Sequence, residues 1–278
     1  MTLSQQNSAF DRDGFTVSRA LFSESEVERF IEHFMDLRAR GKWPGDFAGV
    51  DLTSSDPLQR YPRMIHMHRW DEESLAWLLD ARLNEAMTSL LGREPYAVQT
   101  MLYFKPPGAR GQALHQDQFY LRVEPGTCIA AWLALDRCDE ENGCMQVVPG
   151  SHLLPLLCTE KADTARSFTD VTVPMPPGES AIPVLMEPGD VLFFVGNLIH
   201  GSLPNRSATR FRRALIGHYI SGEAERVGQF YSPVLRMDGT VAALGESPLG
   251  APCGVFRGVN GETVVEMLSQ TPSAALHE

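Results

Sequence analysis

Apolar positions in the N-terminal third of the chain recur every three or four residues, the spacing typical of helices that pack on a core. This pattern runs through ESEVERFIEHFMDLRA, and Ser23 with Glu26 makes a capping box in front of it, which predicts a helix over 24–40. The same spacing returns over 71–91, where acidic residues occupy the first turn and Gly92 follows the last apolar position. It predicts a second helix that Gly92 ends.

Beyond Pro95 the pattern changes to short apolar runs separated by turn residues. The run over 128–135 carries no charged residue, so we expect a strand that is buried on both faces. Helices followed by many strands indicate an α+β chain, mainly β, whose core is a β-sandwich or barrel. The expected strands, including a short one near the N-terminus, cover 14–22, 96–104, 128–135, 180–185, 190–195 and 212–220.

Three segments fit neither pattern well. Residues 44–62 contain Pro and Gly and are expected to form a loop. Residues 153–180 are rich in Pro, Thr and Asp, which indicates a long connection that could act as a lid. In the C-terminal part, only 261–269 has a plausible helical pattern.

The length and composition fit a single domain. A chain of 278 residues with 43% hydrophobic content can bury a large core, and mainly-β domains of this size are common. We expect one domain over 1–278, with a helical part over 1–94, the catalytic core over 95–220 and a C-terminal extension over 221–278. A net charge of -11 and a pI near 5.2 disfavour nucleic acid and anionic membranes as partners.

The sequence predicts a cytoplasmic protein. Its N-terminus, MTLSQQNSAFDRDGF, has neither the basic nor the apolar region of a secretory signal, and no apolar run is long enough to cross a bilayer. The cysteines are odd in number, scattered and without a CxxC pair, which indicates reduced thiols and disfavours a zinc site built on them. Two of the five stand in apolar stretches, where we expect small core residues. The five are Cys128, Cys138, Cys144, Cys158 and Cys253.

A candidate metal site begins at the triplet HQD. On an extended chain His115 and Asp117 point to the same side, so an imidazole and a carboxylate can meet at one point. His200 follows much later, at the end of the apolar run VLFFVGNLIH. Two imidazoles and one carboxylate form the facial triad that suits iron(II) and leave three positions for an oxoacid and dioxygen. An isolated HxD is a weak signal, but this order of ligands and strands favours a metal site.

An oxoacid bound at such a metal needs a partner for its far carboxylate, and the planar fork of an arginine matches it. Arg212 begins the expected strand RRALIGHYI and is the best placed of four candidates to point inward, although a surface charge at a strand end is the alternative. Arg206 and Arg210 stand in the turn NRSATR, and Arg213 has the opposite parity to Arg212.

With these motifs in order, the sequence resembles the phytanoyl-CoA dioxygenase family of iron(II)/2-oxoglutarate oxygenases. The resemblance spans most of 10–220, from GFTVSRALFSESEVERF onward, and gives little beyond it. It implies a double-stranded β-helix, the cupin-like jelly roll, with N-terminal helices packed on the major sheet. The segments that carry it are MLYFKPPG, HQD, AAWLALDRCDEENGCMQVVPGSH, EPGDVLFF, HGSLPNRS and RRALIGHY.

The resemblance also implies roles for single residues. His115, Asp117 and His200 match the metal ligands, and Arg212 matches the arginine that binds 2-oxoglutarate. Lys105 and Trp132 match residues that contact or line the same pocket. The interval from His200 to Arg212 is a residue longer than in the family's commonest form, which leaves Arg210 as an alternative anchor.

The implied activity is a dioxygenase that uses Fe(II), 2-oxoglutarate and O2, hydroxylates an unactivated carbon, and releases succinate and CO2. In related halogenases a small residue replaces the acidic ligand, so Asp117 favours hydroxylation, with desaturation or ring closure as alternatives. A cupin-like metal protein that does not use 2-oxoglutarate, such as an isomerase or a binding module, is the rival from another class. It would need the metal ligands without Arg212, Lys105 and Trp132 together.

The substrate is expected to be a small molecule, and the segment RYPRMIHMHRW bears on its nature. Arg63, His66 and His68 could form an anion-binding lobe over the site; alternatively this is a solvated loop whose arginines pair with Asp71, Glu72 and Glu73. Gln118 and Tyr120 could also line the pocket. A small polar or anionic metabolite, such as an amino acid or organophosphonate, is favoured over a hydrophobic natural-product intermediate, and a CoA thioester comes third. The sequence makes no prediction of the oligomeric state.

Overall fold

The computed structural model describes residues 3–46, 50–248, 250, 252–259 and 262–269. Helix α2 begins with the predicted capping box, in which Glu26 N–H donates to Ser23 Oγ and the Glu26 carboxylate accepts from Ser23 N–H. The helix predicted over 71–91 is divided into two helices, α4 and α5. The first ends at Leu78, and Asp80 caps the second by accepting from Arg82 N–H. An unpredicted helix, α1, precedes them. The longer helices are α1 (Leu3–Asp13), α2 (Glu24–Ala39), α4 (Glu72–Leu78) and α5 (Ala81–Leu91).

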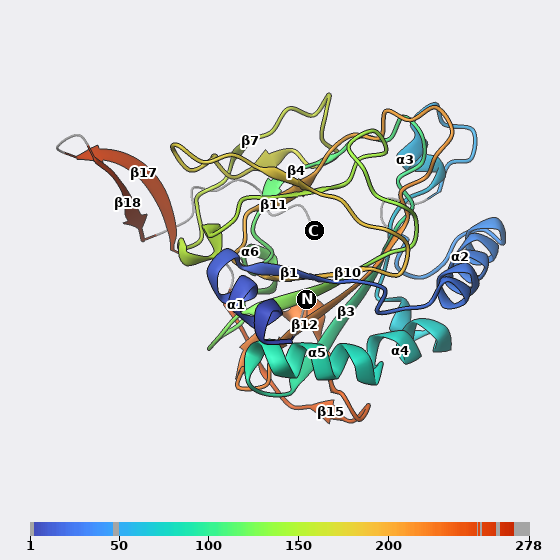
Figure 1. Cartoon of the computed structure of the whole chain (residues 1–278), viewed down its shortest axis with the longest axis horizontal. Coiled ribbons are helices and arrows are strands. Elements are labelled where there is room, and N and C mark those ends of the chain that lie inside the picture. The colour runs from blue at the N-terminus through green and yellow to red at the C-terminus, as the bar shows by residue number, and fades with distance from the viewer. Residues whose placement is uncertain (1–2, 47–49, 249, 251, 260–261, 270–278) are drawn as a thin grey trace.

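Two antiparallel sheets face each other and form the jelly roll that the sequence predicts (Figure 1). The major sheet has the order β1-β10-β5-β12-β3-β14-β15, with β2 also pairing with β3, and the minor sheet has the order β4-β11-β6-β9. The major strands are β1 (Phe15–Ser18), β2 (Met64–Ile65), β3 (Pro95–Tyr103), β5 (Cys128–Ala134), β10 (Val191–Val195), β12 (Ala214–Ser221), β14 (Val234–Arg236) and β15 (Val241–Ala242). The minor strands are β4 (Gln112–His115), β6 (Met145–Val147), β9 (Ile182–Val184) and β11 (His200–Ser202).

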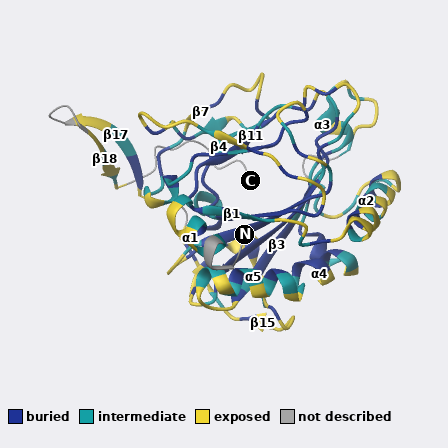
Figure 2. Cartoon of the chain, viewed as in Figure 1, coloured by how far each residue is buried: buried dark blue, intermediate teal, exposed yellow. Residues whose placement is uncertain are grey.

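The N-terminal helices pack on the outer face of the major sheet, as predicted (Figures 1 and 2). All seven residues of β5 are buried, and from Ile129 to Ala134 they alternate between two hydrophobic clusters. Leu133 faces outward and shares a cluster with Phe34 and Trp77 of the helices. Trp132 faces inward and lies between the sheets with Phe194. The predicted two-sided burial of this strand is therefore confirmed, and the inner face is the one that surrounds the site.

Shorter elements fill the connections and the C-terminal extension. Residues 153–180 lie against β4: Val173 N–H donates to Leu114 O at 2.8 Å, and Ser167 Oγ accepts from Ala113 N–H at 2.9 Å. The function of this segment as a lid stays a prediction. The short elements are α3 (Pro57–Arg60), η1 (Met67–Arg69), α6 (Gln118–Leu121), η2 (Ser151–Leu153), η3 (Gln229–Tyr231), β7 (Glu160–Lys161), β8 (Val171–Thr172), β13 (Arg226–Val227) and β16 (Gly245–Glu246).

The helix predicted over 261–269 is wrong for the described residues 262–269. Strand β17 (Cys253–Val259) pairs antiparallel with β18 (Glu262–Leu268) in a separate two-stranded sheet that extends away from the sandwich in Figure 1. The run TVVEML contains adjacent β-branched residues, which suit an extended chain better than a helix. Pairing with a partner strand therefore outweighed a weak helical periodicity.

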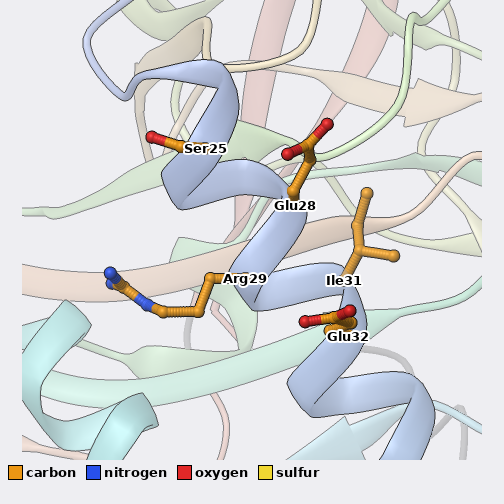
Figure 3. A pocket seen from close by; sticks show the side chains of 5 residues that line it. All are labelled: Ser25, Glu28, Arg29, Ile31 and Glu32. Atoms are coloured by element: carbon orange, nitrogen blue, oxygen red, sulfur yellow. The ribbon is translucent and has the colours of Figure 1, made fainter.

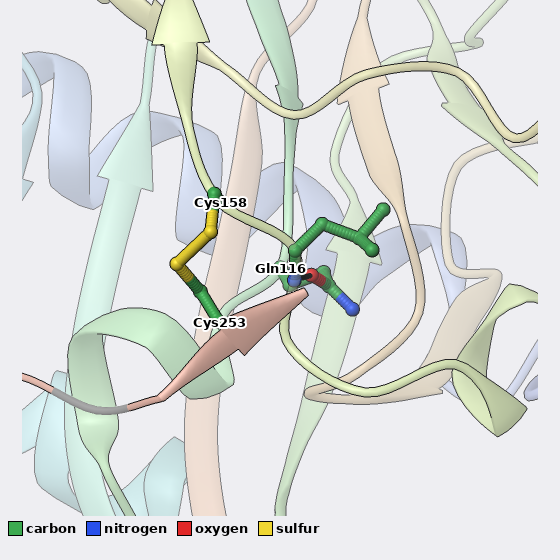
Figure 4. Close-up of a disulfide and its surroundings, with 4 residues drawn as sticks. Gln116, Cys158 and Cys253 are labelled. Carbon is green, nitrogen blue, oxygen red and sulfur yellow. Dashed lines mark hydrogen bonds between the residues drawn. A yellow bond between two sulfur atoms is a disulfide. The ribbon is translucent and has the colours of Figure 1, made fainter. Parts of the chain in front are cut away.

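The expectation of five reduced thiols is also wrong, because Cys158 and Cys253 form a disulfide (Figure 4). The two cysteines are 95 positions apart. The neighbouring residues Leu157 and Gly254 form a β-bridge, so the two segments meet only in the folded chain. Cys128 and Cys144 are free and buried, as expected for small core residues, and Cys138 is free and buried as well. Among the described residues, no helix is long and apolar enough to cross a bilayer.

Candidate metal centre

Three expected ligands meet where two strands of the minor sheet pair. His115 ends β4 and His200 begins β11, and the two residues are direct antiparallel partners. Asp117 follows His115 by two positions, at the start of α6. The ligand atoms of the three lie within 4.8 Å of one another: Nε2 of His115 is 3.4 Å from Asp117 Oδ1, and Nε2 of His200 is 3.6 Å from Asp117 Oδ2. All three side chains are buried, so the strands bring the separated motifs to one point.

Hydrogen bonds set the proton positions on both imidazoles. Nδ1 of His115 lies 2.9 Å from the carbonyl oxygen of Ala113, and Nδ1 of His200 lies 3.0 Å from that of Leu198. Because a carbonyl only accepts, Nδ1 carries the proton in each ring and Nε2 keeps its lone pair. The amide nitrogen of Gln112, a donor, lies 3.1 Å from Nε2 of His115, which agrees with this tautomer. Each Nε2 is therefore prepared to bind a metal.

The charges of the site also suit a metal. Burial by itself would raise the pKa of Asp117, but the nearby His200 and His218 and a hydrogen bond from His218 lower it well below its ordinary value. Burial lowers the pKa of His200 to about 4, and repulsion from His115 adds to the effect. At neutral pH the centre thus offers an ionised carboxylate and a neutral imidazole, the forms that bind a cation. A set of two imidazole nitrogens and one carboxylate fits iron(II).

A third histidine, which the sequence interpretation missed, supports the carboxylate from the major sheet. Nε2 of His218 in β12 lies 3.1 Å from Asp117 Oδ2, and its Nδ1 lies 3.0 Å from the side-chain oxygen of Gln99 in β3. A signal for it existed. His218 has the same strand parity as Ala214 and Ile216, which face the inner cluster, so an inward-pointing histidine could have been inferred.

Arg212, Lys105 and Trp132 form a second buried group. Arg212 is only 2% exposed, its guanidinium lies 5.1 Å from the ring centroid of Trp132, and its Nε donates to Gly143 O at 3.0 Å. Nζ of Lys105 donates to Ser202 Oγ at 2.8 Å and also to the carbonyl oxygens of Gly143 and Leu203. Burial, followed by repulsion from Arg212, lowers the pKa of Lys105 well below its ordinary value.

Within the part of the chain that the structure describes, neither Arg212 nor Lys105 forms an ion pair with a carboxylate. Buried cationic groups are costly unless an anion meets them, so this pair of side chains suits a bound carboxylate. Of the other arginine candidates, Arg210 pairs with Asp139 and Glu141 near the surface. Arg213 pairs with Asp136, and Arg206 is exposed. Arg212 is the one of the four that is fully buried.

The expected substrate residues divide into two groups. Tyr120 lies beside the triad, with its ring centroid 6.1 Å from that of His115, and burial followed by the charge of Asp117 raises its pKa to about 12. Gln118, in contrast, is engaged by backbone: its amide donates to Val123 O and accepts from Cys128 N–H. It serves the turn after the metal-binding triplet.

The basic segment before α4 is mostly folded into the protein. His66 and His68 are buried, and Nδ1 of His68 lies 3.1 Å from Thr100 Oγ1. Arg63 is half-buried, donates to the hydroxyl of Tyr103 at 3.1 Å, and lies over the rings of Tyr103 and Phe168.

The alternative pairing of these arginines with the following acids fails for Arg69. Arg69 donates instead to the carbonyl oxygens of Phe230 and Ser232, at 3.3 and 2.9 Å. Asp71 caps α4 through Ser74, and Glu73 pairs with Arg29. The segment is therefore a folded wall beside the site rather than a solvated loop.

A surface hollow elsewhere has no connection with this chemistry. It is formed by successive turns of α2 alone and includes none of the candidate ligands (Figure 3). Its lining residues are Ser25, Glu28, Arg29, Ile31 and Glu32.

The jelly roll and its buried His-Asp-His site define a class, the non-haem iron oxygenases with a 2-oxoglutarate co-substrate. A family model described as phytanoyl-CoA dioxygenase (PhyH) matches residues 10–214, and the chain belongs to this family. It is 28% identical over 237 residues to the peroxisomal phytanoyl-CoA dioxygenase of Rattus norvegicus, covering 80% of this chain and 70% of the relative. It is 30% identical over 246 residues to the ectoine dioxygenase of Sphingopyxis alaskensis, covering 80% and 78%.

Solved structures agree with this assignment. The structure of EctD from S. alaskensis with 2-oxoglutarate and 5-hydroxyectoine has a TM-score of 0.59 and 27% identity, covering 78% of this chain and 76% of that one. The epimerase SnoN in complex with Fe3+, alpha ketoglutarate and nogalamycin RO has a TM-score of 0.64 at 21% identity, covering 80% and 85%, and supports the fold alone. The chain is an iron- and 2-oxoglutarate-dependent dioxygenase of the phytanoyl-CoA dioxygenase type.

Proposed function

We propose that this protein hydroxylates an unactivated carbon of a small polar or anionic molecule, with His115, Asp117 and His200 as its iron ligands. The observation that carries the proposal is the convergence of these three buried side chains, with both Nε2 atoms facing the carboxylate. Their arrangement covers one side of a metal ion and leaves the other side to co-substrate and oxygen. We assign the whole chain, 1–278, to one catalytic domain, with a cytoplasmic location as the sequence predicts.

Arg212 and Lys105 bind the far carboxylate of 2-oxoglutarate in this proposal, and Trp132 forms a wall of the same pocket. The two basic side chains are buried without a partner carboxylate among the described residues, and Trp132 lies against the guanidinium of Arg212. A charged fork held by packing places a carboxylate with fixed orientation. Ser202 and the carbonyl oxygens at Gly143 and Leu203 keep the amine of Lys105 in position.

When bound, the iron and 2-oxoglutarate supply the oxidising chemistry: O2 is consumed, succinate and CO2 are released, and a hydroxyl group enters the substrate. The protein's own residues hold the carboxylate of Asp117 in an ionised form, orient both imidazoles, and exclude water by burial. Because Asp117 would supply the acidic ligand that halogenases lack, hydroxylation is the expected outcome.

The substrate side of the site is formed by Arg63, Tyr120, His66 and His68. Arg63 lies over two aromatic rings, where its guanidinium can meet a carboxylate or a phosphonate. The relative named ectoine dioxygenase, whose solved structure holds 5-hydroxyectoine, supports a small polar substrate. The exposed ring of Phe230 supports the second candidate, a more hydrophobic natural-product intermediate.

An anaerobic titration tests the proposal. Iron(II) is added first and 2-oxoglutarate second, and a weak visible charge-transfer band is expected only when both are bound. His115→Ala should lose iron binding, and Arg212→Leu should keep iron but lose the band. Arg210→Leu, at a surface ion pair, is the matched control. Iron binding without any band in the native protein would favour the rival, a metal protein that does not use 2-oxoglutarate.

A further inference from the structure

His66 combines a rare backbone conformation with burial. It lies between β2 and η1 with φ of 55°, in the left-handed region that residues other than glycine seldom adopt. Its side chain is 8% exposed. Residues other than glycine are strained in this region, and such residues concentrate at ligand sites.

Both ring nitrogens of His66 are buried and have no hydrogen-bond partner among the described residues. The other histidines in the described ranges each have at least one bonded nitrogen; His68 contacts Thr100, for example, and His218 contacts Asp117. A buried polar group without a partner is costly, so native proteins seldom leave two such atoms on one ring. A ligand that bonds to this ring would remove the cost.

His66 lies close to two aromatic rings and to a histidine that contacts a metal ligand. Its ring centroid lies 4.7 Å from that of Phe230 and 6.3 Å from that of Tyr231. His218, which contacts the ligand Asp117, is close enough to influence the charge of His66. Phe230 is 56% exposed, and Arg69 holds its backbone carbonyl. The imidazole of His66 and the exposed ring of Phe230 thus lie together near the metal centre.

The ring of His66 is uncharged at neutral pH. Burial is the main cause that lowers its pKa to about 3, and the nearby Arg69, His68 and His218 lower it further. A neutral imidazole offers one donor and one acceptor. It complements a hydroxyl or an amide, which can both accept and donate, better than a carboxylate, which only accepts.

We propose that His66 determines substrate specificity by hydrogen bonding to an uncharged hydroxyl or amide group, while a nonpolar face of the substrate packs on Phe230. This inference rests on the proposed function and refines it, since an anionic group of the same substrate would be placed at Arg63. The substrate class is then a small ring or chain with a neutral polar group beside an apolar face.

Two fragments of nearly equal shape test the inference on the full chain loaded with Zn(II) and 2-oxoglutarate. Cyclohexanecarboxamide is neutral and can donate and accept, whereas cyclohexanecarboxylate is anionic and only accepts. NMR of 15N-labelled histidine rings reports which imidazole each fragment contacts. We expect the amide to shift the His66 signals and to bind about tenfold more tightly than the carboxylate, the size of one hydrogen bond.

Variants separate a specific contact from general packing. His66→Gly keeps the left-handed backbone without strain and should weaken amide binding about tenfold, to the level of the carboxylate. Phe230→Ala should weaken both fragments by the same factor. His33→Ala, at a histidine that pairs with Asp71 on the outer helices, should leave both affinities unchanged.

Equal amide affinity in the native protein and in His66→Gly would overturn the inference, as would a carboxylate that shifts the His66 signals and binds more tightly than the amide. Unmoved His66 signals with both fragments would also overturn it. Binding of 2-oxoglutarate is followed in the same samples through its own signals. Its failure to bind would count against the proposed function, whereas normal binding with no effect at His66 would count against this inference alone.

Discussion

Nε2 of His218 lies 3.1 Å from Oδ2 of Asp117, so the carboxylate of the metal centre is held by a residue 101 positions away on the opposite sheet. Gln99 in turn contacts the other nitrogen of His218 at 3.0 Å. A strand of the major sheet thereby fixes a ligand that stands on a turn after the minor sheet. The position of Asp117 depends on the closure of the sandwich as well as on its own loop.

We expect His218→Leu to weaken iron(II) binding, because the variant leaves the Asp117 carboxylate with one fewer partner to orient it. Loss of such an outer contact costs about 10- to 100-fold in metal affinity. His218→Gln, which keeps a donor, should retain part of the affinity. Anaerobic titration calorimetry measures both constants, and a native affinity in His218→Leu would show that the contact does not position the ligand.

Arg212→Leu should weaken 2-oxoglutarate binding while iron binding stays normal. Removing one partner of a buried charge pair costs about 2 to 5 kcal/mol, which corresponds to a loss of at least about 30-fold. Arg210→Leu breaks only a surface pair with Asp139 and Glu141 and should change the constant little. The dissociation constants for 2-oxoglutarate decide the matter. Equal losses of 2-oxoglutarate affinity in the two variants would show that Arg212 does not bind the co-substrate.

Local patterns were sufficient for the elements whose stabilising contacts are near in sequence. The capping box at Ser23 and Glu26 predicted α2, and the uncharged run over 128–135 predicted the buried strand β5. His115 and Asp117 meet at one point, as predicted, although β4 ends at His115 and Asp117 stands at the start of α6 rather than on an extended strand. In each case the deciding interaction lies within a few residues, or one periodicity determines which face is buried.

Features that depend on distant partners or on the conformation of a single residue escaped the sequence interpretation. The break at Asp80 divides one predicted helix into two, because that side chain caps α5 better than it continues α4. The pairing of Cys158 with Cys253 and the strand at 262–268 both depend on segments that meet only after folding. The left-handed backbone of His66 had no sequence signal, since histidine is not a residue that marks such a turn.

Acid should destabilise the metal-free protein between about pH 6.5 and pH 4. Burial lowers the pKa of His68 and of His200 to about 4 and that of His66 to about 3. The unfolded chain therefore binds protons in this window that the folded protein does not, and stability falls as the pH falls, by at most about 1.4 kcal/mol per pH unit for each histidine. Thermal unfolding at pH 7.5, 6 and 5 measures the slope. A constant unfolding temperature would mean that these rings protonate freely in the folded state.

The disulfide connects the C-terminal hairpin to the loop that supports the metal-binding triplet. Gln116, between the two ligands of that triplet, accepts from Leu157 N–H at 2.8 Å, and its amide donates to Pro155 O at 3.2 Å and to Asn197 O at 2.9 Å (Figure 4). Cys158 follows Leu157 directly and is bonded to Cys253 at the start of β17. The cross-link therefore restrains a loop that holds the residue between His115 and Asp117.

Cys253→Ser should lower the free energy of unfolding, since the cross-link closes a long loop in the unfolded chain, an effect of up to about 4 to 5 kcal/mol. The variant should also exchange amide hydrogens faster in β17 and β18, because a two-stranded hairpin has little stability of its own.

Cys158→Ser should behave identically, whereas Cys138→Ser, at a free buried thiol, should leave exchange in the hairpin unchanged. Denaturant unfolding and hydrogen exchange measure the two effects. If reduction of the native protein changed neither, the two segments would be held by packing of Phe256 and Val265 on Leu157 and its neighbours, and the cross-link would add nothing to it.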